Sequence, residues 1–262
     1  MRIWFQSGTG VGIDGKFTPY QESITKHAKK VSRPDTICEF HGPGKTYPFN
    51  RSRALHNPVI REYMKNAMFA EAQGFDAIMT NTIDSGITEI REVVAIPVVG
   101  MGEATLSFSC QLAANFAFIT WAHKAYEKGQ LPWLVELAER YGFKERMVEG
   151  GCLGHNFTNL LELWGNPAPY IEEFNRLAEN IVSRGADLII PTPLPLSQWL
   201  IDQNIKQIKG ATIVDPLAIG IKTAELMVDL QKLGIKRPKI GTYAPAPVEI
   251  RTALSKELGG GL

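Results

Sequence analysis

The chain has 262 residues, 44% of them hydrophobic, and its 28 Lys and Arg residues nearly balance its 27 Asp and Glu residues. That length and composition suffice for one large α/β domain or two small ones. The formal charge of +1 gives no electrostatic reason to expect nucleic acid or an anionic membrane as a partner. We therefore expect a small-molecule ligand.

Cysteine usage and the N-terminus indicate the compartment. Cys38, Cys110 and Cys152 are far apart and lack CxxC spacing, which argues against a disulfide framework and a structural zinc site. The opening stretch MRIWFQSGTG lacks the apolar core of a secretory signal, and no run of about 18 apolar residues occurs. No HxH or HExxH spacing suggests a metal. These features predict a cytoplasmic protein without a metal site.

Strand-like and helix-like patterns alternate along the chain. In chain order we expect strand 2–7, helix 19–31, strand 35–42, helix 57–74, strand 75–81, strand 91–100, helix 103–116, strand 116–120, helix 131–143, helix 169–185, strand 186–192, helix 196–204, strand 211–215 and helix 216–234. Asn57 is the expected cap of the second helix, with Pro58 as its first residue and Gly74 as its stop. The glycine-rich stretch 149–159 is predicted to be a loop, and the proline-containing stretch 241–250 a non-helical crossing.

A weak internal repeat divides this pattern in two. The sequence helix, Gly-x-Asp, strand occurs as AEAQGFDAIMTN and as IVSRGADLIIPT, and the same 111 residues separate Gly74 from Gly185 and Asp76 from Asp187. Repeated βα units predict parallel sheets with helices on both faces. We expect two related α/β halves, residues 1–101 with 217–262 and residues 102–216. Asn81 and Thr192 then occupy equivalent strand ends, where α/β proteins bind ligands.

Residues 57–227 resemble a known family. GFDAIMTNTIDSGITEIREVVAIPVVGMGEATLSFSCQLAANFAFIT is similar to a stretch of the hydantoin and allantoin racemases of the aspartate/glutamate racemase superfamily, and GADLIIPTPLPL with ATIVDPLAIGIKTAELM resembles its second half. The resemblance implies two pseudo-symmetric flavodoxin-like halves with an active site in a cleft between them. It also implies chemistry without a cofactor, in which one cysteine of each half moves a proton at the carbon next to a carbonyl.

This sequence departs from that pattern at both thiols. Aligned on the family's motifs, the first cysteine falls on Asn81 and the second on Thr192. An amide has no proton-transfer chemistry near neutral pH, and a threonine hydroxyl is a poor base until it is activated. We therefore expect a polar pocket of Asn81, Thr82, Ser85 and Thr192 that stabilises a developing negative charge, with Asp84 as a candidate base. The alternative for Asp84 is an Asx-turn or a cap of the next helix.

Other polar residues at strand ends are candidates for substrate binding. They are Gln6, Ser7, His41, Thr120 and Pro191, and ordinary turn or surface roles are their alternatives. Cys152 and His155 form an alternative nucleophile and base pair if their loop covers the pocket. The stretch GVGIDGKF matches G-x-x-x-x-G-K but has Phe17 where a P-loop needs a hydroxyl, which argues against phosphate binding.

Three functions remain open at this point. The first is an isomerase, lyase or hydrolase that acts on a small carboxylate or cyclic amide through a hydrogen-bonding pocket; the family includes decarboxylases and cis-trans isomerases. The second is a racemase or epimerase with substitute bases. The third is a non-catalytic protein that binds a metabolite. A homo-oligomer is compatible with all three.

Overall fold

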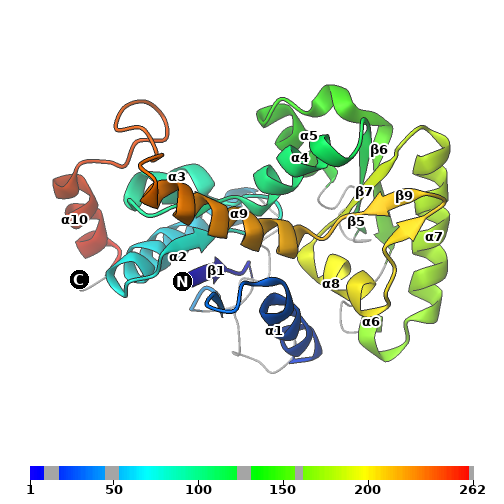
Figure 1. The fold of residues 1–262 in the computed structure, drawn as a ribbon, viewed down its shortest axis with the longest axis horizontal. Helices are drawn as coiled ribbons and strands as arrows, with labels where there is room; N and C mark the ends of the chain where they lie inside the picture. The colour runs from blue at the N-terminus through cyan, green and yellow to red at the C-terminus, as the bar shows by residue number, and fades with distance from the viewer. Residues whose placement is uncertain (9–17, 45–52, 123–130, 157–161, 260–262) are drawn as a thin grey trace. The chain divides into compact units, whose positions relative to one another are not determined.

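The computed structural model describes residues 1–8, 18–44, 53–122, 131–156 and 162–259 (Figure 1). Its elements in chain order are β1 (Arg2–Gln6), α1 (Thr18–Val31), β2 (Ile37–His41), α2 (Arg53–Ala72), β3 (Ala77–Met79), α3 (Ile87–Val93), β4 (Val98–Val99), α4 (Met101–Leu112), β5 (Phe116–Ala122), α5 (Leu131–Arg140), the 3-10 helix η1 (Lys144–Arg146), β6 (Met147–Asn156), α6 (Glu162–Gly165), α7 (Ala168–Ser183), β7 (Leu188–Pro191), α8 (Leu194–Asp202), β8 (Gln207–Ile208), β9 (Ala211–Ile213), α9 (Pro216–Lys232) and α10 (Val248–Glu257).

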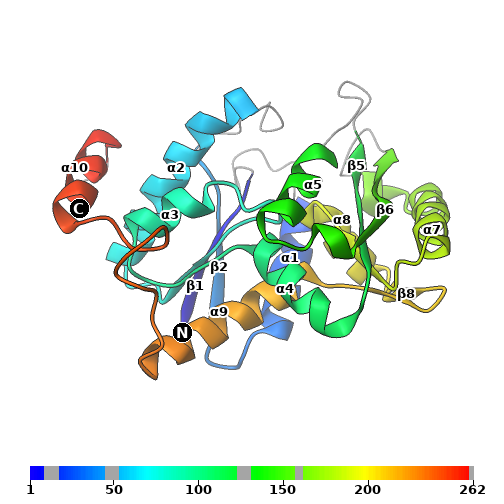
Figure 2. The same ribbon diagram turned by 90° about the horizontal axis from the view of Figure 1, so that it is seen from above.

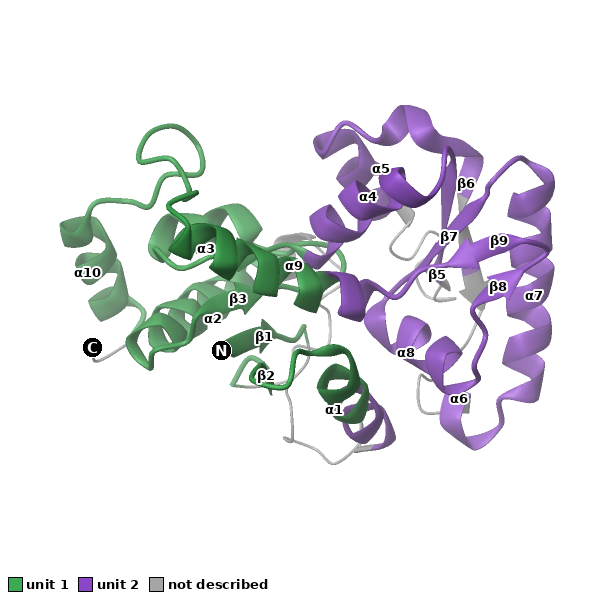
Figure 3. Ribbon diagram, in the orientation of Figure 1, with its two compact units in different colours: residues 1–15, 25–100, 220–262 green, residues 16–24, 101–219 purple. Residues whose placement is uncertain are grey.

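Two compact units make up the chain (Figure 3). The first comprises residues 1–15, 25–100 and 220–262, and the second residues 16–24 and 101–219. The division expected from the sequence differs from this one by one residue near position 101 and by three near position 217. It also placed residues 16–24 in the first half, whereas the first residues of α1 group with the second unit.

Each unit has its own sheet, and the two sheets share a strand order. The first is β2-β1-β3-β4, and the second is β6-β5-β7-β9 with β8 added at the edge. All pairings are parallel except that of β8 with β9. The predicted α/β class with parallel sheets flanked by helices is confirmed, and β3 and β7 occupy corresponding places in their sheets.

The Gly-x-Asp repeat has the same structural role in both units. Gly74 and Gly185 follow the preceding helices at φ 74° and 96°, a left-handed conformation that glycine adopts without steric cost. The Asp76 carboxylate then accepts a hydrogen bond from the Arg2 amide at 2.7 Å, and the Asp187 carboxylate accepts one from the Asn115 amide at 2.8 Å. Each aspartate therefore ties the start of its own strand to that of the neighbouring strand.

We expect Asp76→Ala to lower the free energy of unfolding by about 1–3 kcal/mol, because the Arg2 amide loses its charged acceptor in a partly buried place. Asp187→Ala should cost less, since its contacts are exposed. Urea unfolding of both variants measures the difference. A larger effect at position 187 than at position 76 would contradict the assignment.

Apolar side chains from helices cover the sheets. In the first unit, Trp4 and Ile78 of the sheet pack with buried residues of α2 and α3, and in the second unit Ala117 and Ile189 pack with buried residues of α7 and α8. Figure 2 shows α2 and α3 on one side of β1 and β2, with α9 on the other. The carboxyl ends of β3 and β7 run into connecting loops, and several of the polar candidate residues lie in these loops.

The crossing between β3 and β4 differs from the sequence prediction. Residues 91–100 were expected to form a strand, but α3 runs through Val93 and β4 is only Val98–Val99. Ile87, Ile90 and Val93 are buried at the three-residue spacing of one helix face. Pro97 has no amide to donate, which confines the strand to the two residues after it.

Three further local predictions were wrong. The helix expected to start at Asn57 starts at Arg53, so Pro58 lies inside α2 and Asn57 is not its cap. The predicted loop 149–159 forms most of β6 through Asn156, because strand pairing uses backbone groups and tolerates glycines at a sheet edge. The stretch 241–250 crosses without helix only to Pro247, after which α10 begins. Within the described residues, no helix combines the length and apolarity that a membrane span requires.

Candidate functional site

Polar side chains gather where β3 ends, and we call Thr80, Asn81, Thr82, Asp84 and Ser85 the first strand-end cluster. All but Asn81 are buried, and Asn81 is half-buried. The Asn81 Oδ1 atom accepts hydrogen bonds from the Ile83 amide at 3.2 Å and from the Ser85 amide and hydroxyl at 3.4 Å. Asn81 thus forms the Asx-turn of this loop, and its amide has one orientation.

Asp84 lies at the centre of the cluster, with 1% of its surface exposed. Its backbone is left-handed, with φ 52°, and its Oδ1 atom accepts a hydrogen bond from the Thr80 hydroxyl at 3.4 Å. The N-cap position of α3 is Gly86, and the Asp84 carbonyl accepts a hydrogen bond from the Ile87 amide at the start of that helix at 3.3 Å. Non-glycine residues enter this backbone region at a cost, which other contacts must offset.

Gly100 allows the Asp84 carboxylate its position. A β-carbon on Gly100 would lie 2.7 Å from the Asp84 carboxyl carbon and 2.4 Å from the Ile87 Cδ1 atom. No real β-carbon makes such contacts, so only glycine fits here. The loop after β3 therefore packs closely against Gly100, the residue after β4.

Tyr63 of α2 contacts the first strand-end cluster through Asn81. Its side chain is 1% exposed, and its hydroxyl makes a hydrogen bond with the side chain of Asn81. Burial raises the pKa of this hydroxyl well above its ordinary value, which keeps it protonated. The spacing of Val59, Tyr63 and Ala67 marks a buried helix face in the sequence, but nothing in that pattern indicates the contact with Asn81.

Gln6 and His41, expected to bind substrate, make contacts on the sheet face. The Gln6 Oε1 atom accepts hydrogen bonds from the Trp4 indole at 3.2 Å and the Asn66 amide at 3.1 Å. The His41 ring stacks on the Trp4 ring with centroids 3.4 Å apart. Ser7, at the end of β1, is buried, and its amide donates to the His41 carbonyl at 2.7 Å. Ser7 is thus the one of the three that directly follows the strand.

We expect His41 to make the fold sensitive to mild acid. Burial lowers the pKa of His41, an effect that Glu39 opposes and Arg2 reinforces. The unfolded chain then binds a proton near pH 6.5 while the folded chain does not, so stability falls as the pH drops below that value. Between pH 7.5 and 5.5 the melting temperature of His41→Phe, which keeps an aromatic ring on Trp4, should fall less than that of the wild type. Burial also lowers the pKa of His56, so part of the fall in melting temperature should remain in His41→Phe. Equal falls in both proteins would contradict the assignment.

The second strand-end cluster consists of Pro191 and Thr192, at the end of β7, with Thr120 of the neighbouring β5. The strand that was expected to end at Thr120 continues to Ala122, so Thr120 lies within β5. All three are buried, and the Thr192 amide donates to the Ile119 carbonyl at 2.9 Å. The peptide bond between Thr192 and Pro193 is cis. The Thr120 hydroxyl is fully buried and has no hydrogen-bond partner within the described part of the chain. A buried hydroxyl of this kind is a donor in need of an acceptor.

Cys38 and Cys110 belong to elements other than the two strand-end clusters. Cys38 is in β2, paired with Ile3 near the start of the sheet, and burial followed by the charge of Glu39 raises the pKa of its thiol to about 12. Cys110 is in α4. The backbones of Cys152 and His155 lie in β6, paired with Phe118 and Trp121, instead of in a loop, but their side chains lie outside the described part of the structure. The Cys38 thiol is therefore protonated at neutral pH and unsuited to proton transfer.

The chemistry that the two clusters offer is acid-base work by a carboxylate and hydrogen bonding by hydroxyls and amides. No group of three or more His, Cys, Asp or Glu residues within the described ranges could hold a metal ion. Tyr63, Thr80 and Gly100 are the members of the site that the sequence did not indicate. Their roles depend on contacts between elements that periodicity does not predict.

The fold and its strand-end clusters define a class of protein, namely an α/β protein of two units whose sheets share a strand order, with polar groups after the corresponding strands β3 and β7. Residues 20–224 match the family model of the Asp/Glu/Hydantoin racemases, and the chain belongs to that family. It is 25% identical over 228 residues to a hydantoin racemase of Pseudomonas sp. (strain NS671), with 85% of each chain covered.

Solved structures show the same fold. An allantoin racemase from Klebsiella pneumoniae superposes with a TM-score of 0.76 at 19% identity, covering 94% of both chains. An allantoin racemase from Pseudomonas fluorescens gives a TM-score of 0.74 at 21% identity, covering 95% of this chain and 97% of the other. The fold therefore extends beyond the residues that the family model matches.

Proposed function

We propose that this protein is a cofactor-independent enzyme that acts on a small carboxylate or a cyclic amide through an enolate. Family membership supports an enzyme, and the relatives' names point to cyclic amides of the hydantoin and allantoin type. The observation that carries the proposal is the buried Asp84 carboxylate in the same short loop as the hydrogen-bonded Asn81 amide, at the strand end that the family resemblance gives to a thiol.

Each group has a role in such a reaction. The Asp84 carboxylate removes the proton next to the substrate carbonyl, and the electron pair of that C–H bond moves to the carbonyl oxygen to form the enolate. Hydroxyl groups of Thr82, Ser85, Thr120 and Thr192 are the candidate donors to that oxygen or to a substrate carboxylate. If the substrate carries a second carboxylate, loss of CO2 forms the same enolate without a base, and a proton then completes the reaction. An enolate pocket therefore serves both isomerase and lyase chemistry.

The test is incubation of the purified protein in D2O with each enantiomer of 5-substituted hydantoins, with each enantiomer of allantoin, and with substituted malonates. Racemisation or epimerisation predicts loss of optical rotation together with one deuterium at the reacting carbon. Decarboxylation predicts release of CO2 and one deuterium at the same carbon. Ring opening without deuterium at carbon would exclude the enolate and favour hydrolysis.

Thermal shift with the same compounds distinguishes a metabolite-binding protein from an enzyme. A ligand that raises the melting temperature without any turnover would overturn the proposal in favour of binding alone. Turnover that survives unchanged in Asn81→Ala and Thr192→Ala would place the reaction away from both clusters. We expect instead that Thr192→Ala lowers turnover while the protein stays folded, since the residue supplies one donor to the developing charge.

A further inference from the structure

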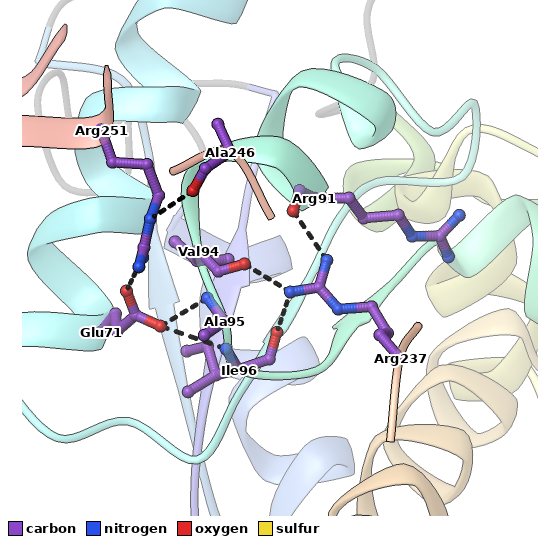
Figure 4. Close-up of polar contacts among 8 residues, drawn as sticks. All are labelled: Glu71, Arg91, Val94, Ala95, Ile96, Arg237, Ala246 and Arg251. Atoms are coloured by element: carbon purple, nitrogen blue, oxygen red, sulfur yellow. Dashed lines mark hydrogen bonds and ion pairs between the residues drawn. The ribbon is translucent and has the colours of Figure 1, made fainter. Parts of the chain in front are cut away.

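The C-terminal part of the chain makes hydrogen bonds to the connection between α3 and β4 in the first unit (Figure 4). The residues that contribute these contacts lie in the stretch 237–251, beyond α9 and beyond the part of the chain that the family model matches. We call this stretch, with Glu71 of α2, the C-terminal clamp.

Arg237 is the first half of the clamp. Its guanidinium donates to the Arg91 carbonyl at 2.7 Å, to the Ile96 carbonyl at 3.3 Å and to the Val94 carbonyl. These carbonyls lie at the end of α3 and just after it, where a helix leaves acceptors without partners of its own. A planar fork of donors on one cation can serve three of them at once, which an ammonium group cannot do with the same geometry.

Glu71, Ala246 and Arg251 are the second half. The Glu71 carboxylate accepts hydrogen bonds from the Ala95 amide at 2.6 Å and the Ile96 amide at 3.1 Å, and pairs with the Arg251 guanidinium at 3.3 Å. Arg251 also donates to the Ala246 carbonyl at 3.1 Å. The connection is thus held through its carbonyls by Arg237 and through its amides by Glu71, as Figure 4 shows.

Two further contacts tie the same stretch to α3. The Ala246 amide donates to the Glu92 carbonyl at 2.7 Å. The Arg91 guanidinium lies 4.7 Å from the centre of the Tyr243 ring and donates to the Val98 carbonyl at 3.1 Å. The stretch therefore contacts α3 directly, and Arg91 of α3 links that contact to β4.

A short path of hydrogen bonds leads from α3 to the first strand-end cluster. The Ile87 amide donates to the Asp84 carbonyl at 3.3 Å, and the Asp84 amide donates to the Asn81 carbonyl at 3.1 Å. A seven-residue helix is only about 10 Å long, so the loop and the clamp contact opposite ends of one short element.

We propose that the C-terminal clamp sets the position of α3 and, through it, of the loop from Asn81 to Gly86, with Arg237 as the positioning residue. The inference does not depend on the proposed reaction, because its test measures backbone protection and needs no substrate. It predicts that loss of Arg237 loosens a loop to which Arg237 makes no hydrogen bond.

The test is hydrogen-deuterium exchange, followed by mass spectrometry, on the full-length protein and on Arg237→Ala. We expect amide exchange in residues 82–86, which Arg237 does not contact, to be at least about tenfold faster in the variant, with residues 186–191 of the second unit unchanged. If Arg237→Ala does not fold, the test uses Arg237→Lys. Lysine keeps the charge but not the planar fork of donors, and we expect exchange in residues 82–86 at least about threefold faster than in the wild type.

Arg33→Ala is the matched control. Arg33 also lies in the first unit and forms ion pairs, but its partners are Asp229 and Glu225 of α9. The control should speed exchange around α9 without a selective effect on residues 82–86. Wild-type exchange of residues 82–86 in the Arg237 variants, even with faster exchange in residues 91–96, would overturn the proposal. A uniform rise across the first unit that Arg33→Ala reproduces would also overturn it.

Discussion

Replacement of Asp84 by asparagine is expected to lower turnover by about a hundredfold to ten-thousandfold, the range that a general base contributes. The amide has nearly the size of the carboxylate and still accepts a hydrogen bond from the Thr80 hydroxyl, so the loop should keep its shape. What the variant loses is the one carboxyl group in the first strand-end cluster. Steady-state rates on whichever substrate the deuterium experiment identifies measure the effect.

Asp76→Asn is the matched control for this substitution. Asp76 precedes β3 as Asp84 follows it, and its carboxylate accepts from the Arg2 amide at the opposite end of the strand. The control should lose stability and keep its turnover. If Asp84→Asn turned over substrate at the wild-type rate, Asp84 would be a structural residue of the loop, and the base would have to be sought elsewhere.

Gly100→Ala should destabilise the protein by roughly 2–3 kcal/mol and lower turnover as well. The new methyl group would lie 2.7 Å from the Asp84 carboxyl carbon and 2.4 Å from the Ile87 Cδ1 atom. The Ile87 side chain can rotate, but Asp84 is buried and held in a left-handed backbone conformation. Inserting a methylene into such a place costs about 1–3 kcal/mol, and displacing the carboxylate moves the proposed base.

Thermal unfolding measures the first effect, with an expected fall in melting temperature of about 2–4 °C per kcal/mol for a unit of this size. Gly165→Ala is the control, because nothing lies within 4 Å of the added β-carbon there. The control should unfold at the wild-type temperature or slightly above it. A Gly100→Ala protein as stable as the control would show that the loop after β3 yields easily, and would weaken the case that it holds Asp84 in place.

Most of the fold could be predicted from local patterns. The alternation of strand and helix predicted the α/β class, and the Gly-x-Asp repeat predicted a correspondence that the two strand orders bear out. Prediction failed where a pattern is ambiguous at short range. The run 93–99 is apolar enough for a strand, but the burial of Val93 with Ile87 and Ile90 makes Val93 part of the last turn of α3.

The candidate site was predicted in part. The positions of Asn81, Asp84 and Thr192 after their strands follow from the sequence, because a parallel strand brings its next residues to the carboxyl end of the sheet. The contacts of Gln6 and His41 could not be predicted from the sequence. Which side of a strand faces a helix, and what that helix offers, depends on Trp4 and Asn66, which are distant in sequence from His41.

The sequence by itself therefore determined the class of fold, the correspondence of the strands after Gly74 and Gly185, and the absence of thiols at positions 81 and 192, since these depend on residue type and on spacing along the chain. Only the tertiary structure decided that Asp84 is buried against Gly100, that Tyr63 contacts Asn81 and that Arg237 holds the end of α3. Those contacts join residues far apart in the chain. Their energies arise from desolvation and close packing, which no local pattern records.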